Sequence, residues 1–205
     1  EESLQIIKRL WTEDVVSFEG EHFKIRDARP SAWPLQKPYP PVWIAANGDG
    51  PIRRAAGLGD VWFAAPHAKF ATLERQMSIY HEAVDANENE RPADVVVMRE
   101  LVVASSRDDA LSLAGPALQG RYRIYAEQGQ DRQLPTGDRF NMPFEQLAED
   151  RFILGDPDDC VEQIKRYEGL GFNYLIIDYH WPDLDDTVAL DTLKRFGSSV
   201  LPRFR

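Results

Sequence analysis

The sequence has little of what several classes of protein require. Its single cysteine, Cys160, excludes an internal disulfide and a zinc site built from cysteines, and makes a reducing cytoplasm the expected compartment. Apolar runs are short, the stretch 174–177 being typical, so we expect no membrane-spanning segment. Lysine and arginine number 24 against 34 aspartate and glutamate residues, a net charge of −10, so a nucleic-acid partner is not expected.

Hydrophobic residues nevertheless make up 43% of the 205 residues, which is enough for a packed core. Apolar residues recur at helical spacing over 2–13, and an alternating pattern over 18–23 predicts a short hairpin. Five prolines between residues 29 and 41 predict an extended connector, since proline fixes φ and has no N–H group. Because the chain opens at Glu1 inside a helical pattern, we expect part of the protein to lie upstream.

Apolar runs then alternate with helical patterns along the rest of the chain. Strands that are apolar on both faces are typical of parallel sheets covered by helices on both sides. The expected strands are 42–46, 61–65, 95–104 and 174–179, and the expected helices are 51–59, 69–87, 108–127, 156–171 and 185–200. The stretch 128–150 is expected to be a surface insertion, because its first part is rich in Gly, Asp, Gln and Arg. We expect residues 1–205 to belong to a single domain.

Two α/β architectures suit four such units: an open doubly wound sheet, or half of a (β/α)8 barrel, which takes ~250 residues when complete. The half barrel is favoured for two reasons. The chain opens within a helix, and no strand is followed by the glycine fingerprint of dinucleotide-binding sheets. The pair Gly57 and Gly59 stands at a helix end, where that fingerprint does not occur.

In parallel βα folds, ligands gather at the carboxyl ends of the strands. The first expected strand is followed by Asn47, Gly48, Asp49 and Gly50 and then by a helix. Two glycines let the backbone approach a ligand, and the helix start offers free N–H groups, so this bend predicts a phosphate site. Asp49 opposes it by repelling an anion, while Arg53 and Arg54 either add positive charge or point to solvent. A plain strand-to-helix turn is the alternative.

Other candidates follow the remaining strands. His180 could act as an acid or base and Trp181 could form the wall for a planar ligand; the alternative is that Trp181 packs on the helix behind it and His180 is solvated. His67 holds a similar place after the second strand. No metal site is predicted, since the histidines are scattered and the cysteine is single. Arg99 is unusual inside an apolar strand and either faces the barrel mouth or marks an edge.

The remaining residues receive structural interpretations. His22, on the hairpin, and His81, in a helix, are expected to be structural. Trp43 and Trp62 lie within strands and are expected in the core.

Several motifs, in this order and spacing, resemble the luciferase-like flavin-dependent monooxygenase family (bacterial luciferase type), in its C-terminal half. The motifs are Leu10-Trp11 with 18–23, the connector 33–41 leading into 42–44, the stretch 53–63, the stretch 152–158 with 169–175, and His180-Trp181-Pro182 followed by 196–202. Together they cover nearly the whole chain. The resemblance implies a (β/α)8 barrel in which the present strands are strands five to eight.

The resemblance also implies a flavin-dependent oxidoreductase. The expected cofactor is reduced FMN, which would use oxygen to oxidise a small organic substrate. A deazaflavin is the alternative cofactor. The family's phosphate cradle falls on Asn47, Gly48, Asp49 and Gly50 here, and Trp181 is expected to contact the cofactor. His180 and His67 are the catalytic candidates. A separate flavin reductase and a second copy of the chain are the expected partners.

Barrel strands one to four normally supply most contacts to the flavin and the substrate. We therefore expect the chain alone to be inactive and the parent protein to be an enzyme. One rival hypothesis is a non-catalytic flavin-binding module. Another is a stable α/β fragment without a ligand.

Overall fold

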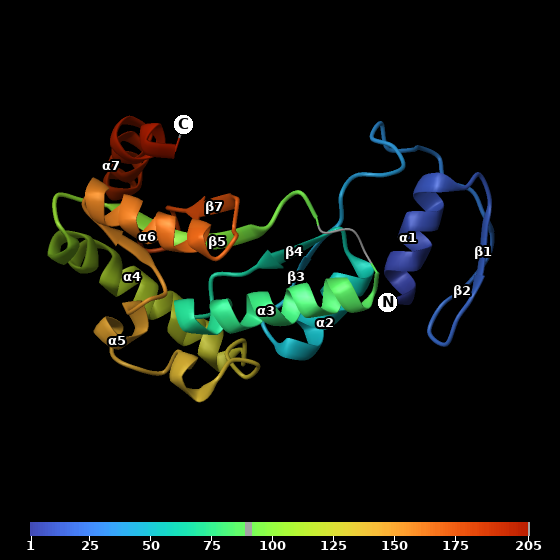
Figure 1. The fold of residues 1–205 in the computed structure, drawn as a ribbon, viewed down its shortest axis with the longest axis horizontal. Coiled ribbons are helices and arrows are strands. Elements are labelled where there is room, and N and C mark those ends of the chain that lie inside the picture. The colour runs from blue at the N-terminus through green and yellow to red at the C-terminus, as the bar shows by residue number, and fades with distance from the viewer. Residues whose placement is uncertain (89–91, 205) are drawn as a thin grey trace.

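The protein is described by a computed structural model that covers residues 1–88 and 92–204 (Figure 1). Its main sheet is entirely parallel, with the order β3-β4-β5-β7 and a short strand β6 that extends the pairing of β5. The strands are β3 (Trp43–Ala45), β4 (Val61–Ala64), β5 (Val96–Val103), β6 (Ile153–Gly155) and β7 (Tyr174–Asp178). The expectation of parallel βα units is confirmed.

The amino-terminal part lies to one side of this sheet in Figure 1. It consists of α1 (Glu2–Thr12) and an antiparallel pair, β1 (Val16–Glu19) and β2 (Lys24–Ala28). The expected helix and hairpin are therefore confirmed. The connector that follows has no helix or strand, and α1 contacts the main body where Lys8 Nζ donates to Leu58 O at 2.9 Å.

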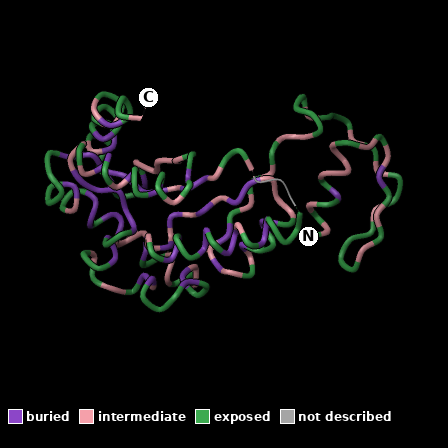
Figure 2. The backbone as a smooth tube through the Cα atoms, viewed as in Figure 1, coloured by how far each residue is buried: buried purple, intermediate pink, exposed green. Residues whose placement is uncertain are grey.

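Five longer helices follow the strands of the sheet: α2 (Asp49–Leu58), α3 (Phe70–Ala86), α4 (Arg107–Glu127), α6 (Pro157–Gly169) and α7 (Asp186–Arg195). Neighbouring residues of β5 show which faces they cover. Arg99 bonds Tyr167 of α6, whereas Glu100 bonds Tyr122 of α4. Because side chains alternate along a strand, α6 and α4 cover opposite faces of the sheet. Figure 2 shows the buried backbone concentrated along the strands and the helix sides that face them.

The expectation that all four strands are covered on both faces is wrong for β3 and β7. Trp43 is 38% exposed and Tyr174 is 46% exposed. In register, both residues point to the face that carries Glu100, and α4 covers that face only near the carboxyl ends. The core expectation is correct for Trp62, which is buried, and wrong for Trp43.

The two outer strands bring their aromatic side chains together. The rings of Trp43 and Tyr174 meet at 5.4 Å although β4 and β5 lie between their strands. Residues on the same face of a flat sheet would be about 14 Å apart across three strand spacings of ~4.8 Å. The sheet is therefore strongly curled, with Trp43 and Tyr174 on its concave face.

The stretch 128–150, expected on the surface, contributes to the core. Its elements are η1 (Thr136–Asp138) and α5 (Phe144–Ala148), and its buried side chains include Leu134, Phe140 and Leu147. The short strand β6 that follows was not expected, because three residues carry too little pattern to predict a strand. The last expected helix ends at Arg195. It is followed by a π-helical turn, η2 (Phe196–Val200), and a 3-10 helix, η3 (Leu201–Phe204). No helix in the described part of the chain is long and apolar enough to cross a bilayer.

Candidate active site

Side chains that follow three strands meet at the carboxyl edge of the sheet. Asn47 Nδ2, after β3, lies 2.8 Å from His67 Nδ1, after β4. The His67 ring is 5.4 Å from the ring of Tyr125 on α4. Arg121 then bonds the Tyr125 hydroxyl at 2.7 Å and Asp178, the last residue of β7, at 2.9 Å. A continuous line of contacts therefore crosses this edge.

The bend at 47–50 leads directly into α2. Gly48 occupies the N-cap position, and no side chain caps the helix. The first-turn N–H groups of an uncapped helix are free to bind an anion. The Asn47 carbonyl is fixed from α3, because Gln76 Nε2 donates to it at 2.6 Å. The backbone here is thus held in place while its helix start stays open.

Asp49, which opposes anion binding, is neutralised by a partner that the sequence did not indicate. Arg75 on α3 forms two hydrogen bonds with the Asp49 carboxylate, at 2.8 and 2.9 Å. The Arg75 guanidinium, with a smaller contribution from Arg53, holds the pKa of Asp49 below its usual range. A guanidinium nitrogen of Arg54 lies 3.8 Å from the position that a Cβ on Gly50 would occupy. The guanidinium groups of Arg75 and Arg54 therefore place positive charge next to the bend.

His67 is half-buried behind the bend. Burial first, and then the positive charges of Arg151, Arg99 and Arg121, lower the pKa of His67 to about 4. The imidazole is therefore neutral at physiological pH. Rings of Tyr122, Tyr125 and Phe140 surround it, with centroids 6.2, 5.4 and 5.5 Å away.

Arg99 lies neither at an exposed mouth nor at an edge, so both alternatives from the sequence are wrong. It is fully buried on the central strand β5, where Nε donates to the Tyr167 hydroxyl at 2.9 Å. Its neighbour Glu100, which the sequence analysis missed, is also fully buried. The adjacent pair of charges inside an apolar run was the available signal.

Glu100 faces the α4 side of the sheet. Its Oε1 accepts from the Tyr122 hydroxyl at 3.0 Å, while Oε2 is buried without a partner among the described residues. Burial raises the pKa of Glu100 to about 7, although the charge of Arg121 opposes this. Glu100 pairs in register with Asp178, so two carboxyl groups flank the single guanidinium of Arg121.

A pocket of about 330 Å³ lies between α4 and the loop after β7. Its lining residues are Ala117, Arg121, Ile124, Tyr125, Asp178, His180, Trp181, Pro182 and Asp183. Trp181 is buried, and its Nε1 has no partner within residues 1–88 and 92–204. His180 lies at the exposed rim, with Nε2 3.0 Å from Asp186 Oδ1. Both candidates therefore line the pocket, at the same sheet edge as the bend.

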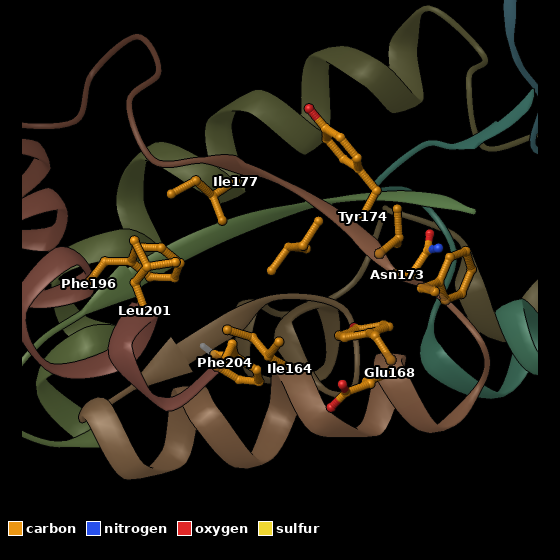
Figure 3. Close-up of a pocket in the computed structure, with 12 residues that line it drawn as sticks. Ile164, Glu168, Asn173, Tyr174, Ile177, Phe196, Leu201 and Phe204 are labelled. Carbon is orange, nitrogen blue, oxygen red and sulfur yellow. The ribbon is translucent and has the colours of Figure 1, made fainter. Parts of the chain in front are cut away.

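A second pocket, of about 360 Å³, lies between β7, α6 and the carboxyl-terminal turns (Figure 3). Its lining is mostly apolar and includes Ile164, Ile177, Phe196 and Phe204. It does not include the bend or either histidine, so it is separate from the candidate site. The described residues contain no cluster of three or more acidic, histidine or cysteine side chains that could hold a metal ion.

Residues 1–174 match the family model described as luciferase-like monooxygenase. The chain is 31% identical to an F420-dependent glucose-6-phosphate dehydrogenase of Rhodococcus erythropolis, a match over the whole chain and 59% of that relative. It is 29% identical to the enzyme of the same description from Mycolicibacterium smegmatis, over the whole chain and 60% of that relative. The chain thus spans about 60% of the length of these relatives.

Solved structures share the fold. Monooxygenase RslO1 from Streptomyces bottropensis superposes with a TM-score of 0.79 at 18% identity, over the whole chain and 60% of that protein. An F420-dependent secondary alcohol dehydrogenase, in complex with an F420-acetone adduct, gives a TM-score of 0.76 at 16% identity, again over the whole chain and 60% of that protein.

Proposed function

Because this chain belongs to the luciferase-like monooxygenase family, we propose that it is part of a deazaflavin-dependent dehydrogenase that oxidises a hydroxyl-bearing carbon. The curated relatives named above and one structural neighbour are F420-dependent dehydrogenases of a sugar phosphate and a secondary alcohol. Their shared chemistry supports the deazaflavin over reduced FMN, which the sequence motifs alone placed first. We therefore place the deazaflavin before reduced FMN, because the relatives that match the whole chain are F420-dependent.

The observation that carries the proposal is that the open α2 helix start and the pocket lie at the same edge of the sheet. Both cofactors carry a phosphate group on their side chain. The amides of Asp49 and Gly50 would hold that phosphate, because no side chain caps α2 and Arg75 neutralises Asp49. Asn47 and Gly48 would shape the bend.

The pocket under α4 supplies the other part of the site. Trp181 and Tyr125 offer aromatic surface for a planar group, and α4 covers this face of the sheet near the carboxyl ends of the strands. A bound deazaflavin would supply a hydride acceptor for the carbon that carries the hydroxyl group, and the hydroxyl proton would be released as that carbon became a carbonyl. His180 at the rim and His67 beside the bend remain the candidate groups for moving or holding a proton.

We also propose that β3, β4, β5 and β7 are strands five to eight of a (β/α)8 barrel. The contact between Trp43 and Tyr174 supports a barrel wall, because it requires a strongly curled sheet. The length of the relatives supports a longer whole protein. On this proposal, the chain alone has no dehydrogenase activity.

The proposal is tested with the full-length protein. F420 and FMN are each titrated while fluorescence is followed, and the F420 complex is then mixed with glucose 6-phosphate or with a secondary alcohol. We expect F420 to bind and to be reduced by one of these substrates. Binding of FMN alone, with oxygen consumption, would favour a monooxygenase, and binding without turnover would favour a non-catalytic module.

Two variants of Gly50 test the phosphate site. An alanine fits, because the nearest atom to a Cβ there is 3.8 Å away. We therefore expect Gly50→Ala to leave F420 affinity within about twofold and Gly50→Asp to weaken it by roughly tenfold or more, through repulsion at the helix start. Equal affinities for the two variants would place the phosphate elsewhere.

A further inference from the structure

The loop that carries His67 is held by an unusual set of donors. Three of the four consecutive carbonyl groups of residues 65–68 accept a hydrogen bond from a fully buried arginine, either Arg99 on β5 or Arg151 just before β6. The bonds are Arg99 Nη1 to Ala65 O at 3.3 Å, Arg151 Nε to His67 O at 2.9 Å and Arg99 Nη2 to Ala68 O at 3.2 Å. The fourth carbonyl, Pro66 O, lies 3.4 Å from the hydroxyl of buried Tyr122, whose single proton is donated to Glu100.

This arrangement is costly for stability. Arg99 and Arg151 are buried, and neither forms an ion pair with a carboxylate within the described ranges. Burying a guanidinium without a carboxylate partner carries a large desolvation penalty, only part of which carbonyl groups recover. Arg99 gives two hydrogen bonds and Arg151 gives one to this short loop, while their other hydrogen bonds tie it to neighbouring elements. A loop held by buried side chains in this way resembles a shell that supports a reacting group.

The hydrogen bond from Asn47 fixes the protonation state of the imidazole. Asn47 Nδ2 is a donor, so His67 Nδ1 accepts at 2.8 Å. A neutral ring that accepts at Nδ1 carries its proton on Nε2. Burial and the nearby Arg151, Arg99 and Arg121 lower the pKa of His67 to about 4, so the ring stays neutral. No hydrogen-bond partner for Nε2 is found in the described part of the chain.

We propose that His67 is a fixed, neutral hydrogen-bond donor that presents Nε2–H to a carbonyl or alkoxide oxygen of the bound ligand, and that Asn47 is the positioning residue that sets this tautomer. The proposal rests on the proposed function for the identity of that ligand. The oxygen belongs either to the cofactor ring or to the substrate, and both would be recognised by the same donor.

The first test requires no cofactor. In the full-length protein labelled with ¹⁵N-histidine, we expect His67 to show the Nε2–H tautomer and to remain neutral down to about pH 5. In Asn47→Asp the new carboxylate accepts a hydrogen bond from Nδ1–H, so the tautomer should switch and the pKa should rise. A wild-type Nδ1–H tautomer, or titration near the ordinary histidine range, would overturn the inference even if F420 binds.

The second test identifies the oxygen. His67→Phe keeps a flat ring without a donor, whereas His67→Gln keeps an N–H donor, and thermal unfolding shows whether each variant folds. A loss of roughly tenfold or more in F420 affinity for His67→Phe, partly restored in His67→Gln, assigns the cofactor oxygen. Unchanged affinity with kcat lower by on the order of 100-fold assigns the substrate oxygen. Affinity, KM and kcat all unchanged in a folded His67→Phe would refute the donor role.

These two tests also separate the inference from the proposed function. If neither F420 nor FMN binds the full-length protein, the proposed cofactor is wrong whatever the tautomer of His67. If F420 binds and turns over but the tautomer or the His67→Phe result disagrees, only the inference is wrong.

Discussion

Glu100 shows how one buried side chain can make this fold sensitive to pH. The residue lies inside β5 with no exposed surface, and only one of its carboxyl oxygens has a partner among the residues described. Burial is the main reason that its pKa rises from 4.5 to about 7. Near neutral pH the folded protein therefore holds a proton that the unfolded chain releases.

The variant Glu100→Gln tests this at the residue scale. Between about pH 4.5 and 7 Glu100 binds more protons in the folded state than in the unfolded state, so its contribution to the free energy of unfolding falls as pH rises through this window. The loss attributable to Glu100 is at most about 3 kcal/mol. His67, whose pKa is lowered from 6.5 to about 4, contributes an opposite slope that is common to the wild type and the variant. We therefore expect urea unfolding to show that the free energy of unfolding of the wild type falls relative to that of Glu100→Gln between pH 5 and pH 8.

The matched control is Glu162→Gln, which changes an exposed carboxyl group on α6. It should keep the wild-type slope. Parallel profiles for Glu100→Gln and the wild type would mean that Glu100 titrates in its ordinary range.

At the scale of elements, α6 has the most complete local signal in the chain. The Asp156 side chain accepts from the backbone N–H groups of Asp158 and Asp159, and the Asp159 side chain accepts from the N–H of Asp156. Pro157 at the first helical position completes the start.

We expect Asp156→Ala to lower the free energy of unfolding by about 1 kcal/mol, because two first-turn amides lose their acceptor. Chemical denaturation of the full-length protein measures this. Glu162→Ala, an exposed substitution on the same helix, should have an effect of less than ~0.5 kcal/mol. An equally small effect for Asp156→Ala would show that water replaces the cap without cost.

The elements that could be predicted from sequence are those with local causes. Helical spacing predicted α1 and α3, and a continuous apolar run predicted β5, to within one or two residues. The partial exposure of Trp43 on β3 and Tyr174 on β7 could not be predicted, because it depends on which elements cover the concave face of the sheet. The stretch 128–150 was misjudged because its polar composition masks separate apolar anchors such as Phe140.

The candidate site was predictable only in outline. Parallel topology places the residues after β3, β4 and β7 at one edge, so Asn47, His67 and Trp181 were found from sequence. Their contacts were not, because the distance from Asn47 to His67 and the pairing of Asp49 with Arg75 depend on side-chain positions. The roles of these residues in binding remain predictions.

At the scale of the whole molecule, the curl of the sheet connects segments that are distant in sequence. Trp43 and Tyr174 lie on the two outermost strands of the β3-β4-β5-β7 order, and their rings meet edge to face. An aromatic pair of this kind typically adds about 0.5–1.5 kcal/mol beyond the area that it buries.

A double-mutant cycle with Trp43→Ala and Tyr174→Ala in the full-length protein tests the curl in solution. We expect a coupling free energy of about 0.5–1.5 kcal/mol from the contact. The control cycle pairs Trp43→Ala with Phe23→Ala on the separate hairpin region and should show coupling near zero. A coupling near zero for Trp43 and Tyr174 as well would indicate a flatter sheet.

Gly48, in the bend at 47–50, lies close to the side chain of Gln133, in the stretch 128–150. A Cβ added to Gly48 would come within 3.1 Å of the Gln133 side chain. Any bulkier residue at position 48 thus requires a smaller one at 133, or a shift of the chain there. Homologues should accordingly vary at these two sites in a correlated way, and grafting a foreign insertion into this scaffold should succeed only when both positions are exchanged as a set.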